Sequence, residues 1–137
     1  MNAVLDGSAA LAILLPDERG SKASAAILKA MNGVEALHVP EHWWAEVANG
    51  VIVAERRGRL TQVEGATALE DACEMEPETD VERARLMRDA AALARLYSLT
   101  VYDAAYLELA MRKKATLITL DAALGKAAQK AGVAATP

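Results

Sequence analysis

Short apolar runs alternate along the chain with longer stretches whose apolar residues recur at helical spacing. The short runs predict strands at 2–5, 35–40 and 115–120, with brief extended pieces within 76–80, 99–102 and 133–135. The longer stretches predict helices at 8–15, 21–33, 41–57, from 61 to about 75, 81–98, 103–114 and 121–132. Strands that alternate with helices are joined by crossovers, so we expect an α/β fold with a mainly parallel sheet and helices on both faces.

Capping residues mark several helix ends in this pattern. Ser21 is a predicted N-cap, and Gly33 is a predicted stop for the same helix. Thr61 followed by Glu64 has the spacing of a capping box. Gly132 is expected to end the last helix.

Composition narrows the class of protein. The 137 residues fit one domain, 1–137, and 53% hydrophobic with 25% charged residues indicates a folded core. A net charge of -4 argues against nucleic-acid binding by bulk charge alone. Cys73 is the only cysteine, which excludes an intramolecular disulfide and favours a reducing compartment. We find neither a leader pattern nor the ~18 uninterrupted apolar residues of a membrane helix, so a cytoplasmic protein is expected.

Three aspartates share one sequence context. Asp6, Asp103 and Asp121 each follow an apolar extended run and precede an alanine-rich helical run. Any one of them alone is explained as a helix N-cap, because a carboxylate accepts hydrogen bonds from free helical N–H groups. As a set they also suit a ligand site, because ligands bind beyond the carboxyl ends of parallel strands.

Glu46 adds a fourth carboxylate within an otherwise apolar helical stretch. It either belongs to a solvent-facing stripe or needs a partner in the interior, and Asn49 lies on the same helix face. Four ionised carboxylates can share a site only with a compensating cation, and hard oxygen ligands suit Mg²⁺ or Mn²⁺. His38 and His42 have no cysteine partner nearby, so a zinc site is not expected.

These segments resemble the PIN-domain nucleases, and among them the VapC-type toxins of toxin–antitoxin pairs. The resemblance rests on "VLDGSA", "PEHWWAEVANGV", "LTVYDAAYLELA" and "ATLITLDAAL", which together span most of the chain. Its four acidic positions fall on Asp6, Glu46, Asp103 and Asp121. Ser8 and Thr119 match positions that often carry a hydroxyl near the metal, and Asn49 matches a polar position beside the glutamate. Gly7 departs from the more usual Ala or Thr and is not expected to touch the ligands.

The resemblance implies an endoribonuclease that depends on Mg²⁺ or Mn²⁺ and cleaves RNA phosphodiester bonds with a metal-activated water. It also implies a cognate antitoxin protein and a homodimer. Two related alternatives stay open: a non-catalytic PIN-like binding module, and a PIN nuclease of RNA processing without an antitoxin. A phosphotransfer enzyme with an aspartate nucleophile is a third, although "DGS" lacks the second aspartate that such phosphatases carry two residues on.

Basic and aromatic residues suggest contact surfaces. Arg56, Arg57 and Arg59 are the first candidates for RNA contact. Arg112, Lys113 and Lys114 form a second basic cluster, in which the two lysines are expected to lie at a solvated helix end. Trp43 and Trp44 are adjacent, so one is expected in the core and the other partly exposed. Tyrosines 102 and 106 are expected to pack rather than to take part in chemistry.

Overall fold

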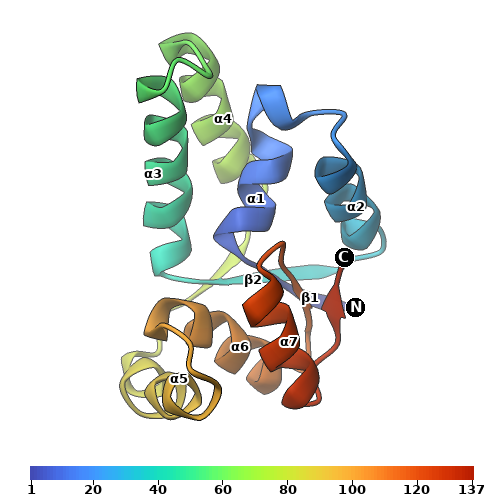
Figure 1. The fold of residues 1–137 in the computed structure, drawn as a ribbon, viewed down its shortest axis with the longest axis vertical. Helices are drawn as coiled ribbons and strands as arrows, with labels where there is room; N and C mark the ends of the chain where they lie inside the picture. The colour runs from blue at the N-terminus through green and yellow to red at the C-terminus, as the bar shows by residue number, and fades with distance from the viewer.

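The computed structural model describes residues 1–137 and contains one five-stranded sheet in the order β3-β2-β1-β4-β5 (Figure 1). Every strand pair in it is parallel, as predicted. The strands are β1 (Asn2–Leu5), β2 (Ala36–Pro40), β3 (Glu78–Asp80), β4 (Thr116–Ile118) and β5 (Ala135–Thr136).

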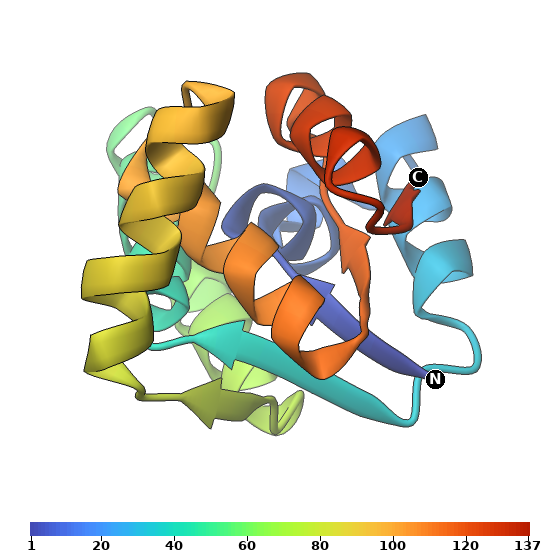
Figure 2. The same ribbon diagram turned by 90° about the horizontal axis from the view of Figure 1, so that it is seen from below.

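Helices cover both faces of this sheet. Figures 1 and 2 show α1 to α4 on one face and α6, flanked by α5 and α7, on the other. The helical elements are α1 (Gly7–Leu14), the short 3₁₀ turn η1 (Pro16–Glu18), α2 (Lys22–Met31), α3 (His42–Arg56), α4 (Gln62–Glu74), the π-helical η2 (Arg85–Ala90), α5 (Ala91–Tyr97), α6 (Val101–Lys113) and α7 (Ala122–Lys130). No helix combines the length and the apolar character that crossing a membrane requires.

The strand order reverses between β1 and β4. From β1 the chain moves outward to β2 and β3, then crosses back to β4 and continues to β5 on the other side. In open parallel sheets this switch point leaves a crevice beyond the carboxyl ends of the two central strands. Leu5 pairs with Ile118 in the register, so the residues that follow them, Asp6 and Thr119, emerge side by side into that crevice.

The core consists mainly of alanine and aliphatic side chains, as expected for a chain without phenylalanine. Its largest fully buried side chains are Trp43 on α3 and Tyr106 on α6. Trp44 is partly exposed, and its ring nitrogen donates to Thr79 Oγ1 at 2.9 Å. The predicted split between the two tryptophans is therefore confirmed.

Most predicted helix ends are confirmed. The Ser21 hydroxyl caps α2, and Thr61 with Glu64 forms both hydrogen bonds of a capping box at α4. Gly33 and Gly132 follow the ends of α2 and α7 with φ of 82° and 77°, a region that glycine adopts without strain.

The prediction of an extended segment at 99–102 was wrong. Thr100 caps α6 by accepting a hydrogen bond from the Asp103 backbone N–H at 3.1 Å, and the helix already begins at Val101. A Thr with a carboxylate three residues later is a strong local start signal, and it outweighs the β-branched and aromatic character of Val101 and Tyr102. Asp103 therefore lies in the first helical turn rather than at a strand end.

Candidate active site

Asp6 lies at the switch point, directly after β1. It is 4% exposed and caps α1, with its Oδ1 accepting hydrogen bonds from Ala9 N at 2.9 Å and from Ser8 Oγ at 2.8 Å. The hydroxyl of Thr119 donates to its other oxygen, Oδ2. The carboxylate is thus held by three donors, two in the first turn of α1 and one directly after β4.

The hydroxyls of Thr119 and Ser8 link the two strand ends. Thr119 Oγ1 accepts from Asp121 N at 3.0 Å, while it donates to Asp6. Ser8 Oγ accepts from Leu120 N at 3.4 Å. Asp121 caps α7 by accepting from the first turn of that helix at 3.0 Å. Both strand-end aspartates are therefore helix caps as well as residues of one crevice.

Glu46 reaches this crevice from α3, and Asp103 reaches it from α6. The Tyr106 hydroxyl donates to Glu46 Oε2 at 2.9 Å, and His42 Nε2 lies 3.6 Å from Glu46 Oε1. The glutamate side chain is 35% exposed, so it is neither on a fully solvated stripe nor buried in the core.

The pKa values of Asp6, Glu46 and Asp103 are all raised, because these carboxyl groups are partly buried and lie near other negative charges of the set. Burial raises the pKa of Asp6, and the charge of Asp121 adds to the rise, while hydrogen bonds from Thr119, Ala9 and Ser8 oppose it. Burial also raises the pKa of two neighbours: the Asp6 and Asp103 charges contribute for Glu46, and the Asp121 and Asp6 charges for Asp103. Negative charges that repel one another across a partly desolvated crevice favour a cation there.

The residues fit a hard divalent cation by their chemistry. All four side chains offer carboxylate oxygens, and each carboxylate retains lone pairs beyond the hydrogen bonds it accepts. No three acidic, histidine or cysteine side chains of the chain converge tightly enough to form a cluster that encloses an ion.

The structure bears on two expectations about the surroundings of Glu46. Asn49 is exposed, and no hydrogen bond joins it to Glu46, so its supporting role stays a prediction. Gly7 was expected to lie clear of the acidic residues, but a Cβ at this position would come within 2.9 Å of Glu46 Oε2.

Of the two tyrosines near the site, only Tyr106 is packed in the interior, and its hydroxyl contact was not foreseen. Burial, together with the charge of Glu46, raises the pKa of Tyr106, so the phenol keeps its proton and remains a donor. Tyr102 is 66% exposed, and its ring packs edge-on against His42 with centroids 5.6 Å apart. Both tyrosines therefore pack against neighbouring side chains, Tyr106 in the interior and Tyr102 at the surface.

The arginines predicted to contact RNA lie away from the carboxylates. Arg56 and Arg57 are exposed at the far end of α3, and ten residues of helix, about 15 Å, separate Arg56 from Glu46. Arg59 is held by Asp17 at 2.7 Å and by a second acid at 3.0 Å. An RNA contact of these arginines stays a prediction.

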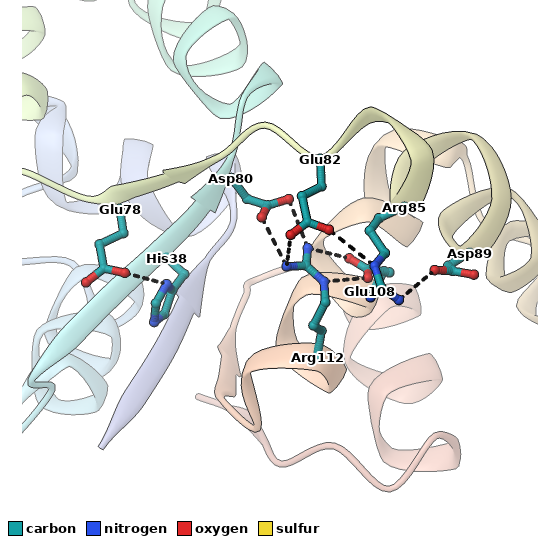
Figure 3. Close-up of polar contacts among 8 residues, drawn as sticks. All are labelled: His38, Glu78, Asp80, Glu82, Arg85, Asp89, Glu108 and Arg112. Atoms are coloured by element: carbon teal, nitrogen blue, oxygen red, sulfur yellow. Dashed lines mark hydrogen bonds and ion pairs between the residues drawn. The ribbon is translucent and has the colours of Figure 1, made fainter.

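Arg112, in the second basic cluster, is the centre of a group of charged side chains (Figure 3). Its guanidinium forms paired hydrogen bonds of 2.9 and 3.1 Å to Asp80 and of 2.8 and 3.1 Å to Glu108. This cluster fastens α6 to the end of β3. In the same view, His38 Nδ1 lies 3.3 Å from Glu78, which joins β2 to β3 away from the acidic crevice.

Comparison with known proteins agrees with this fold. The PIN domain family matches residues 3–130. Ribonuclease VapC3 from Pyrobaculum aerophilum is 37% identical over 127 residues, which cover 92% of this chain and 94% of that protein. The crystal structure of PAE2754 from the same organism shares the fold, with a TM-score of 0.67 and 20% identity over 98% of this chain and 92% of that chain. The chain belongs to the PIN domain family.

Proposed function

We propose that this protein is an endoribonuclease that depends on Mg²⁺ or Mn²⁺ and acts as the toxin of a type II toxin–antitoxin pair. The observation that supports the proposal is the proximity of Asp6, Glu46, Asp103 and Asp121 at the switch point. Burial raises the pKa values of the first three, and the charges of other acids in the set add to each rise. The 37% identity to a ribonuclease over nearly the whole chain supports the same chemistry.

In this proposal the four carboxylates hold the cation. When bound, a divalent ion supplies Lewis acidity to the scissile phosphate and lowers the pKa of a water. The chain itself orients the carboxylates. Thr119 and Ser8 fix Asp6, the α7 N-terminus fixes Asp121, and the first turn of α6 presents Asp103. Glu46 would act either as a further ligand or as the base that orients an attacking water, and part of its surface is open to solvent as that second role requires.

The partners in this proposal are an RNA substrate, a cognate antitoxin protein and a second copy of the chain. The name of the VapC3 relative supports the first two, because VapC-type toxins pair with antitoxins. Exposed Arg56 and Arg57 remain the candidates for binding the RNA backbone outside the crevice. A nuclease of this kind acts in the cytoplasm, where its RNA substrates are.

A non-catalytic PIN-like module is the main competing function. The complete set of four carboxylates argues against it, since a module that only binds partners does not need four acids that repel one another. A phosphotransfer role for Asp6 is also disfavoured, because all of its hydrogen-bond donors hold it at the base of the crevice at 4% exposure.

The test is cleavage of RNA by the purified protein with Mg²⁺, with Mn²⁺ and with a chelator, alongside Asp103→Asn. We expect cleavage only with metal and only with the unaltered chain. Glu74→Gln, an exposed acid at the end of α4, serves as a control for loss of one negative charge. Induced expression of the same three proteins, with growth as the readout, separates a toxin from a nuclease of RNA processing: a toxin arrests growth, and Asp103→Asn does not.

A further inference from the structure

The candidate site also contains a hydrogen-bond donor, the hydroxyl of Tyr106, in addition to the four acidic residues. We propose that Tyr106 is a positioning residue that holds the Glu46 carboxylate in one orientation in the crevice. The assignment of Glu46 to metal binding rests on the proposed function, but the contact between the two side chains does not. The two side chains lie 60 residues apart in the chain and meet at 2.9 Å, Tyr106 Oη to Glu46 Oε2.

Tyr106 is suited to this task because its ring is buried in the core and held there by packing. It is 1% exposed and is one of the two largest fully buried side chains, so the core determines where its hydroxyl points. It lies three residues after Asp103 on α6, which places the donor and one candidate ligand on the same helix face. A rigid donor on a rigid helix defines a fixed point for its acceptor.

Glu46, in contrast, has no second hydrogen bond that fixes its orientation. Its side chain is 35% exposed, it caps no helix, and Tyr106 provides its only hydrogen bond within normal distance. A free glutamate of this exposure samples several rotamers and pays for ordering when it binds a ligand. The hydroxyl contact therefore removes orientations before any ligand arrives.

Packing on the other sides of Glu46 completes the restriction. His42 Nε2 lies 3.6 Å from Glu46 Oε1, and the His42 ring rests edge-on against Tyr106 with centroids 5.0 Å apart. Gly7 faces the same carboxylate, with 2.9 Å between its ideal Cβ position and Oε2. The carboxylate is thus bounded by a donor, a ring and a backbone.

Tyr106→Phe tests the proposal, because it removes the hydroxyl and keeps the ring in the core. Tyr97→Phe is the matched control: Tyr97 packs partly buried on α5 and has no side-chain hydrogen bond. Three measurements are compared: crystal structures of the metal-free proteins, Mn²⁺ affinity by calorimetry, and RNA cleavage. Each tyrosine change is also made together with Glu46→Gln.

We expect Glu46 to adopt more than one orientation in Tyr106→Phe and Mn²⁺ affinity to fall about tenfold, as for other residues that support metal ligands. In the Glu46→Gln background the same change should alter affinity less than twofold. An unchanged Glu46 orientation would overturn the proposal. So would an equal loss of affinity in the Glu46→Gln background, since Tyr106 would then act by another route. If the unaltered protein neither binds Mn²⁺ nor cleaves RNA while Glu46 loses its orientation in Tyr106→Phe, the positioning contact stands and the proposed function fails.

Discussion

Asp6 is both a helix cap and a candidate metal ligand, and two substitutions separate these roles. Asp6→Asn keeps the shape of the side chain, so the new carbonyl oxygen can still accept from Ala9 N and Ser8 Oγ. The new amide then faces the Thr119 hydroxyl, whose oxygen can accept a hydrogen bond. Asp6→Ala removes the acceptor altogether.

The hydrogen bonds of Asp6 give the expected change in the free energy of unfolding for each substitution. Asp6→Ala loses three hydrogen bonds, each worth about 0.5–1.5 kcal/mol, and should lower the free energy of unfolding by about 2–4 kcal/mol. Asp6→Asn keeps the cap, because Asn and Asp cap helices about equally well. It also removes a buried charge whose pKa is raised by burial, so metal-free Asp6→Asn should be at least as stable as the unaltered protein.

Thermal unfolding with and without metal measures both roles of Asp6, as a helix cap and as a metal ligand. At ten times its Kd, a divalent ion should stabilise the unaltered protein by about 1.4 kcal/mol. For a chain of 137 residues this corresponds to a rise in Tm of about 5 °C. Both substitutions should abolish the rise and RNA cleavage, but only Asp6→Ala should lower the metal-free Tm. The reasoning is refuted if Asp6→Asn costs as much stability as Asp6→Ala, or if Asp6→Asn keeps the metal-dependent rise.

Three further predictions concern other charged groups. The folded-state pKa values of Glu46 and Asp103 are raised by burial and by neighbouring acids, so the unaltered protein loses stability as pH rises and these groups ionise. In urea unfolding, metal-free Glu46→Gln/Asp103→Asn should therefore be more stable than the unaltered protein by an amount that grows as pH rises above the ordinary carboxyl pKa of about 4. A difference in stability that is independent of pH would contradict this. Arg112→Met leaves the partly buried carboxylates of Asp80 and Glu108 without their shared cation, and it should lower the free energy of unfolding in urea by on the order of 2–4 kcal/mol. A loss below about 1 kcal/mol would mean that the cluster contributes no more than a surface ion pair. If Arg56 and Arg57 bind RNA phosphates, Arg56→Ala/Arg57→Ala should reduce the slope of log affinity against log salt by about 1.4 in a filter-binding assay, and an unchanged slope would remove them from the RNA surface.

Local signals in the sequence predicted much of the fold around the candidate site. Asp6 and Asp121 each end an apolar run and start a helix, and the rule on strand ends places such residues at one edge of a parallel sheet. Glu46 was noticeable because a charge in an apolar helical stretch requires a partner. At Asp103 the secondary structure was predicted wrongly, because Thr100 rather than Asp103 caps the helix, and its role in the site stays a prediction.

Contacts between distant segments could not be predicted in the same way. The hydroxyl of Tyr106 meets a glutamate 60 positions earlier, and nothing in the spacing along α6 distinguishes this tyrosine from one that only packs. Arg112 at a helix end has the local pattern of a solvated cation, yet β3 supplies a carboxylate from 32 positions earlier. Which partner a polar side chain finds depends on how the helices cross the sheet, and that is a property of the assembled core.

The central claim is that Asp6, Glu46, Asp103 and Asp121 together bind a divalent cation at the switch point of the sheet. The most direct test is anomalous diffraction from crystals of the protein soaked in Mn²⁺. The account predicts an anomalous peak in contact with carboxylate oxygens of this set, and no peak there in crystals of Asp103→Asn under the same conditions. Saturating Mn²⁺ with no peak in the crevice, or a peak that persists unchanged in Asp103→Asn, would contradict it.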